Sequence, residues 1–128
     1  MRQPAVPLWQ ARFLRPQHAL ADCVIMQWQG SGHADTPAAD AHCQLCLAAQ
    51  GEAGSEYIAQ AAFAVFGPPV AIACADWACE WLQGRTIETA RSLNSKDFDK
   101  ALCLAPAERY AALLVLDALS AALADWGP

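Results

Sequence analysis

The densest group of side chains that could bind a metal ion consists of Asp40, His42, Cys43 and Cys46. Carboxylate, imidazole and thiolate groups are the protein ligands of zinc, iron and iron-sulfur clusters. Residues 42–49 also alternate in polarity with the period of two that predicts a β-strand. On a strand, Cys43 and Cys46 point to opposite faces and cannot chelate one ion unless the strand is broken between them. We therefore expect one buried thiol and one at the surface or in a second layer, with a metal site at these four residues as the alternative.

The remaining cysteines and histidines offer weaker chemistry. Cys74 and Cys79 stand about 140° apart around the axis of a predicted helix, which favours core packing over a shared site. Cys103 has no histidine or carboxylate partner in the sequence, and His18 has no evident chemistry. His33 could add a third donor to the Asp40 group if its loop folds back. No serine has the context of a nucleophile elbow and no glycine-rich phosphate loop follows a strand, so the sequence does not predict an enzyme.

Composition and charge limit the classes of protein and partner. The chain has 128 residues, of which 55% are hydrophobic, and we expect a single domain over residues 1–128. Its 13 acidic and 8 basic residues give a net charge of −5 without a basic cluster, which argues against nucleic acid as a partner. The first residues lack the apolar core of a signal peptide, and no apolar stretch reaches the ~20 residues of a membrane helix. We therefore expect a cytoplasmic protein with reduced thiols and no membrane contact.

The clearest periodicity runs from residue 57 to residue 83. Residues 57–66 alternate as a strand, which Gly67 ends. Two prolines then suit the first turn of a helix that continues to about residue 83. Apolar residues cover most of its circumference, so we expect most of this helix to be buried, with only a narrow polar stripe facing water. The stripe consists of Asp76, Glu80 and Gln83.

The other predicted elements complete a small α+β fold. Strands at residues 23–29 and 42–49 would join 57–66 in a three-stranded antiparallel sheet, and the polar, glycine-containing residues 30–41 predict a loop. We expect the helices to pack on one face of the sheet as a second layer. They are predicted at residues 6–14, 68–83, 86–93, 95–102 and 106–126.

Several segments together resemble the NifU N-terminal (IscU-type) family of iron-sulfur cluster scaffolds. The strand that ends at Gly67, the apolar helix that ends in the sequence EWLQG, and the restart at residues 85–90 all follow the family pattern. Residues 13–17 stand where the family has its aromatic-x-x-Pro-Arg segment, and residues 102–126 follow the family's last helix. The resemblance covers most of the chain and implies the same α+β fold.

The resemblance also implies where a cluster would be held. In that family three cysteines and one aspartate bind the cluster, but none of the three thiols is present here. The first cysteine falls at Ala39, and Asp40 could replace the aspartate only after a one-residue shift. Alanine and proline side chains offer no electron pair to iron, so the resemblance predicts a degenerate site without a cofactor. The corresponding positions are Ala39, Asp40, Ala41, Pro68, Tyr110 and Ala111.

A partner segment differs from the family as well. Where the family presents Leu-Pro-Pro-Val-Lys to an Hsp70-type chaperone, a glutamate replaces the lysine. Because reversed charge disfavours the original partner, we expect that this chaperone does not bind, and a titration with a peptide spanning residues 102–109 tests this. The segment consists of Leu104, Ala105, Pro106, Ala107 and Glu108.

Three functional hypotheses follow. The first is a cluster-assembly scaffold-like protein with a degenerate site that acts by binding a protein such as a cysteine desulfurase. The second is a carrier of zinc or an iron-sulfur cluster at a relocated site between Asp40 and Cys46. The third is a structural subunit of a homo-oligomer, in which the apolar strand and the central helix pack on copies of themselves.

Overall fold

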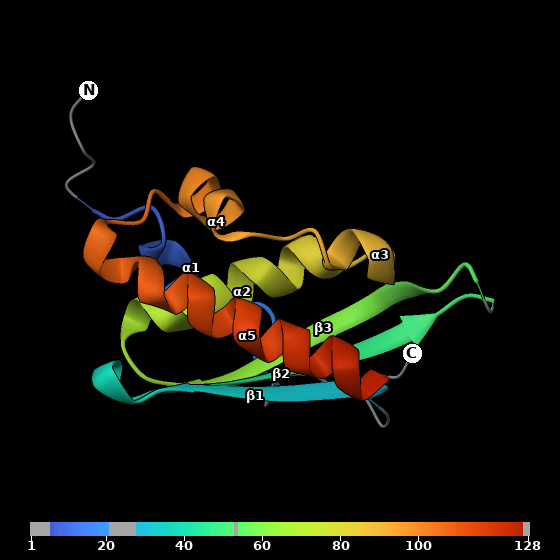
Figure 1. The fold of residues 1–128 in the computed structure, drawn as a ribbon. Coiled ribbons are helices and arrows are strands. Elements are labelled where there is room, and N and C mark those ends of the chain that lie inside the picture. Colours follow the sequence, from blue (N-terminus) through green and yellow to red (C-terminus); the bar gives the residue numbers. More distant parts are fainter. Residues whose placement is uncertain (1–5, 21–27, 53, 127–128) are drawn as a thin grey trace.

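A three-stranded antiparallel sheet with helices on one face forms the fold. The computed structural model describes residues 6–20, 28–52 and 54–126. Figure 1 shows α2 and α5 against the sheet, with α3 and α4 beyond them, which confirms the predicted α+β fold. The strands are β1 (Gly30–Thr36), β2 (Ala41–Gln50) and β3 (Tyr57–Phe66), in the order β1-β2-β3. The helices are α1 (Gln10–Leu14), α2 (Pro69–Leu82), α3 (Ile87–Ala90), α4 (Ser95–Leu102) and α5 (Arg109–Trp126), with 3-10 turns at Pro37–Ala39 and Pro106–Glu108.

The first strand lies where the sequence predicts a loop, so that prediction is wrong. Residues 30–36 pair with β2 in antiparallel register, from Gly30 opposite Leu47 to Thr36 opposite Ala41. Of the strand predicted at residues 23–29, the part from residue 23 to residue 27 lies outside the described residues. Because β2 supplies hydrogen-bonding partners along its whole edge, a polar and glycine-containing segment can form a strand without an apolar alternation of its own.

A glycine in β1 allows α5 to lie directly on the sheet. A Cβ atom added to Gly32 would lie 2.2 Å from the backbone nitrogen of Ala122 and 2.3 Å from the carbonyl oxygen of Ala118. No larger residue fits there unless α5 moves away. At the preceding position, the backbone N–H of Ser31 donates to Asp125 Oδ2 at 2.9 Å. The position of α5 therefore depends on close backbone contact with β1.

The core lies between the sheet and the helices α2 and α5. Alternate residues of β2 face inward and are buried, as the sequence predicts. Trp77 of α2 packs edge-on against the buried Phe98 of α4 with 4.9 Å between ring centroids, which fixes α4 over α2. Within the described residues, no helix is long and apolar enough to cross a membrane. The inward-facing residues of β2 are Ala41, Cys43, Leu45 and Leu47.

The polar stripe predicted on α2 is wrong at Asp76, which is only 1% exposed. Its carboxylate accepts the backbone N–H groups of Gln17 and His18 at 2.7 and 2.9 Å and pairs with Arg12 Nη1 at 3.0 Å. Arg12 also pairs with the exposed Glu80 at 2.5 Å. A buried carboxylate is stable only when such partners satisfy it. These contacts tie the segment after α1 to α2, and we call Asp76, Arg12, Gln17 and His18 the Asp76 cluster.

Candidate functional site

The positions that the resemblance assigns to cluster ligands come together, in part, at one end of the sheet. The connection from β1 to β2 carries Ala39 and Asp40, and the connection from β3 to α2 carries Gly67 and Pro68. These connections are neighbours because β2 and β3 are adjacent antiparallel strands, and both border a hollow of about 430 Å³. We call this region the loop end. It consists of Ala39, Asp40, Phe66, Gly67 and Pro68.

The loop end presents mainly apolar surface. The side chain of Phe66 is 67% exposed, and Asp40 alone is charged among the described residues that line the hollow. Asp40 adopts the left-handed conformation, with φ 50° and ψ 50°, which aspartate tolerates better than most residues. Ala41 is fully buried beside Gly67, where a Cβ atom on the glycine would lie 2.9 Å from that of the alanine. The loop end can therefore bury apolar surface of another molecule, and it offers a single carboxylate.

The third ligand position lies in the first turn of α5, outside the lining of this hollow. Ala111 is fully buried, and Tyr110 is half-buried against the core. Burial raises the pKa of the Tyr110 hydroxyl, and the nearby Cys74 and Glu108 raise it further. At neutral pH this position therefore offers a protonated phenol, which is a much weaker ligand for iron than a thiolate.

The residues of the alternative metal site are divided between the two faces of β2. His42 lies on the exposed face, where its Nδ1 contacts Asp35 and its Nε2 is 4.0 Å from Asp40 Oδ1. Cys43 points into the core, whereas Cys46 lies on the face of His42 four residues further along and is also buried. In the described part of the chain, no three His, Cys, Asp or Glu side chains are grouped closely enough to hold a metal ion.

Asp35 is the residue at this face that the sequence analysis missed. It stands directly opposite His42 in the register of β1 and β2, which became visible only once residues 30–36 were found to be a strand. His33 lies two residues away on the same strand, so its side chain shares that face. His33, Asp35 and His42 border a second hollow of about 310 Å³, which Phe66 also lines.

The thiols near the core are held in the protonated form. Burial raises the pKa of Cys43 to about 12, and Cys46 adds to this shift. Burial also raises the pKa of Cys74 to about 12, with smaller contributions from Glu108, Asp99 and Cys43. The thiolate is the form that binds metals and attacks substrates, so neither thiol is prepared for this chemistry at neutral pH. No disulfide joins the five cysteines that the structure describes.

The segment of residues 104–108 packs against the start of the chain. Leu104 is 7% exposed, while the three residues after it are exposed. Glu108 Oε1 accepts the backbone N–H of Ala105 at 2.8 Å, and its Oε2 accepts the indole N–H of Trp9 at 3.1 Å. The glutamate that reverses the charge of the family segment thus caps a 3-10 turn and links it to the residue before α1.

Comparison with known proteins confirms the resemblance, and the chain belongs to the family of NifU-like N-terminal domains. Residues 12–127 match this family. The chain is 35% identical over 98 residues to the iron-sulfur cluster assembly scaffold protein IscU of Rickettsia prowazekii. The aligned residues cover 76% of this chain and 72% of that protein. It is 30% identical over 97 residues to the protein of the same name from Escherichia coli strain K12, covering 76% and 73% of the two chains.

A solved structure shows the same fold. It is the crystal structure of a protein from Fervidobacterium islandicum AW-1, described as an iron-sulfur cluster assembly scaffold for the SUF system. The two structures superpose with a TM-score of 0.60 and 15% identity, over 77% of this chain and 83% of the other. At this identity the likeness establishes the fold alone.

Proposed function

We propose that this chain is a scaffold-type protein of iron-sulfur cluster assembly that acts by binding a protein partner and does not itself hold a cluster. The observation that carries the proposal is the loop end, where Ala39 and Pro68 stand at positions that the resemblance assigns to thiolate ligands. Neither side chain can bind cluster iron. Family membership and the names of the relatives support the scaffold role.

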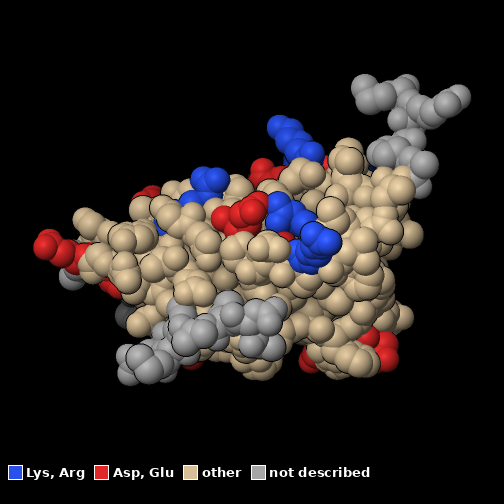
Figure 2. Space-filling view, turned by 180° about the vertical axis from the view of Figure 1, so that it is seen from behind, with Lys and Arg blue, Asp and Glu red and all other residues tan. Residues whose placement is uncertain are grey.

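The loop end also provides a surface on which a partner could dock. Phe66 is exposed and lines two hollows of about 430 and 310 Å³, and large aromatic side chains are frequent anchors of protein interfaces. On the face seen in Figure 2, most of the described surface carries neither acidic nor basic side chains. A cysteine desulfurase is the partner that the family resemblance implies.

The first test is the content of iron and acid-labile sulfide, together with a visible absorption spectrum, in protein purified without oxygen. We expect a colourless sample that also fails to take up a cluster in a reconstitution with iron and sulfide. Stoichiometric iron with sulfide would refute the degenerate site. The residues to mutate next would then be Asp40, His42 and Cys46.

The second test is co-elution with a cysteine desulfurase on a gel-filtration column. We expect a complex with the unmodified chain and a weaker one with Phe66→Ser, because the substitution removes the exposed ring. The matched control is Leu113→Ser, since Leu113 is also an exposed apolar residue, at 54%, but lies on α5 outside the loop end. If both variants co-elute as well as the unmodified chain, the loop end is not the docking surface.

Light scattering on the free protein tests the homo-oligomer hypothesis.

A relocated metal site is the second candidate function, and the contacts of His42 favour it. The Nδ1 of His42 contacts Asp35 and its Nε2 lies 4.0 Å from Asp40 Oδ1, although among the described residues these side chains are not grouped closely enough to hold an ion in the present arrangement. Imidazole and carboxylate groups bind zinc or iron, so this function requires the turn that carries Asp40 to move closer to His42. Retention of zinc after gel filtration should be lost in His42→Ala and kept in His18→Ala. Equal retention in both variants would exclude His42 as a ligand.

A further inference from the structure

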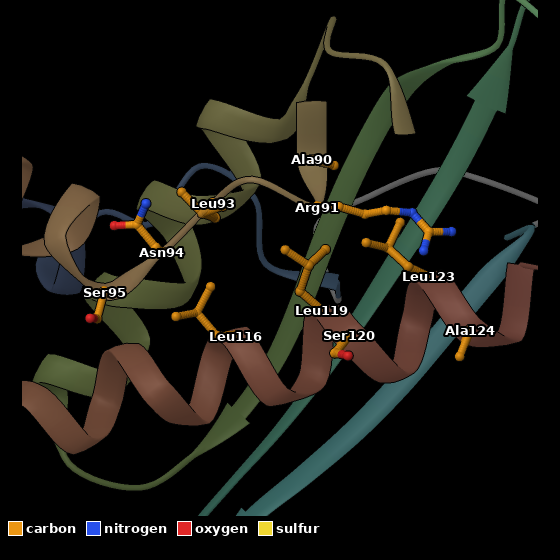
Figure 3. Close-up of a pocket in the computed structure, with 10 residues that line it drawn as sticks. All are labelled: Ala90, Arg91, Leu93, Asn94, Ser95, Leu116, Leu119, Ser120, Leu123 and Ala124. Atoms are coloured by element: carbon orange, nitrogen blue, oxygen red, sulfur yellow. The ribbon is translucent and has the colours of Figure 1, made fainter. Parts of the chain in front are cut away.

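A hollow of about 490 Å³ lies between α5 and the segment that joins α3 to α4. Figure 3 shows Leu93 above and Leu116, Leu119 and Leu123 below, all directed into the same space. Leu93, Leu119 and Leu123 are buried at 6%, 3% and 5% exposure, so apolar side chains line both sides of the hollow. None of its lining residues belongs to the loop end. Its size and lining are those of a pocket for a small molecule.

The wall opposite α5 is held in place by its own hydrogen bonds. At one end, Thr86 Oγ1 accepts the N–H of Thr89 at 3.2 Å and caps α3. At the other end, Asn94 Oδ1 accepts the N–H of Lys96 at 3.0 Å, and Asp97 Oδ2 accepts the N–H of Asn94 at 3.0 Å. These caps fix the joining segment at both ends, and Asn94 of the second cap also lines the pocket. The pocket is therefore preformed, which lowers the entropic cost of binding a ligand.

One cationic side chain borders this apolar pocket. Arg91 is exposed, and in Figure 3 its guanidinium group reaches the end of the pocket beside Leu123. Arg91 also lines an adjoining hollow, together with Glu56 and Glu88, but no hydrogen bond or ion pair of its side chain is found within the described residues. No acidic side chain is present among the ten described residues that line the pocket. In a chain with a net charge of −5, the pocket thus offers an anionic ligand one cation and no carboxylate in its own described lining.

We propose that this pocket binds an aliphatic monocarboxylate of medium chain length, in the form of a free fatty acid. The guanidinium of Arg91 presents two parallel N–H donors that match a carboxylate. The alkyl chain would extend from Arg91 along Leu123, Leu119 and Leu116 towards Ser95, where the pocket ends. Each methylene group that is buried adds about fourfold to the affinity. The site is separate from the loop end and does not depend on the function proposed above.

Titration with octanoate tests the proposal, with amide and methyl NMR spectra of the whole chain as the readout. We expect saturable shifts centred on Leu93, Leu119 and Leu123. Arg91→Gln should weaken binding by about tenfold, the effect of losing a hydrogen bond to a charged group. Arg15→Gln is the matched control, because Arg15 is also exposed and lies outside the pocket. It should leave the affinity unchanged.

Two further comparisons keep the proposal open to refutation. Ala124 is exposed and lines the pocket, so Ala124→Trp should fill the pocket and abolish binding while the fold is kept. The smaller change Ala124→Ser should leave binding intact. Octanol and octylammonium carry the same chain without the carboxylate, and both should bind at least about tenfold more weakly. The proposal is wrong if either binds as tightly as octanoate, if Arg91→Gln has no effect, or if octanoate causes no saturable shifts.

Discussion

Two aspartates show how differently two regions of this fold use a carboxylate. Asp76 is 1% exposed and is satisfied by Arg12 and by two backbone N–H groups. The side chain of Asp40, at the loop end, is 87% exposed, and it lies 4.0 Å from His42 Nε2. The first carboxylate holds distant parts of the chain together, whereas the second is available to solvent or a partner. The comparison indicates that stability depends on the interior, while the loop end can change its side chains at little cost.

The largest expected effect on stability comes from high pH, which should destabilise the interior. The pKa values of Cys43 and Cys74 are both raised from 9.0 to about 12, so the folded state keeps protons that the unfolded chain loses. The contribution of the two thiols to the free energy of unfolding is therefore fully present below pH 9. It falls as the pH rises towards 12, by about 1.4 kcal/mol per pH unit for each thiol. Urea denaturation at pH 8, 9, 10 and 11 should show a loss of about 5 kcal/mol by pH 11.

The control for this loss is the double variant Cys43→Ala and Cys74→Ala. It should begin less stable but lose much less stability between pH 9 and pH 11, because only the tyrosines, the lysines and the other cysteines still titrate. An equal loss in both proteins would show that these thiols do not control alkaline unfolding.

A matched pair of substitutions compares the two aspartates directly. Asp76→Asn removes the charge that satisfies Arg12 and places an N–H donor near two other donors, so it should cost about 3 kcal/mol of unfolding free energy. Asp40→Asn should change the stability by less than about 0.5 kcal/mol, since asparagine also tolerates the left-handed conformation. Chemical denaturation of both variants measures the difference. Similar values for the two would remove the contrast between the regions.

Substitution of Gly32 extends the comparison to the contact between β1 and α5. In Gly32→Ala, the new methyl group would lie within 2.3 Å of backbone atoms of α5, and relief of this clash should cost about 2 kcal/mol. Ser31→Ala is the neighbouring control and should cost less than about 1 kcal/mol, because it loses only weak side-chain contacts to Gln44 and Cys46. The midpoint of thermal unfolding ranks the two variants. If the order is reversed, α5 does not depend on the glycine.

The smallest effect on stability is expected at the loop end. Phe66 is 67% exposed, so Phe66→Ser should change the unfolding free energy by less than about 0.5 kcal/mol. Denaturation in urea measures this, and the co-elution experiment on the same sample shows whether partner binding falls independently. A loss above about 1 kcal/mol would mean that the ring stabilises the folded chain and that the loop end has a structural role.

The sequence predicted the parts of the fold whose residues interact locally or repeat with a clear period. The alternation along residues 57–66 predicted β3, and the prolines and apolar spacing after it predicted α2 (Pro69–Leu82). Thr86 and Ser95 marked the starts of the next two helices to within a residue. At the candidate site, the resemblance identified Ala39, Asp40 and Pro68, which do border one hollow.

Tertiary contacts decided the features that the sequence pattern could not show. Residues 30–36 became β1 because β2 offered an edge to pair with, and this pairing placed Asp35 beside His42. Asp76 occupies a polar position of an amphipathic helix, yet it is buried because Arg12, Gln17 and His18, some 60 residues earlier in the chain, supply its partners. Period and capping depend on neighbours in sequence, whereas pairing and burial depend on segments that meet only after the chain has folded.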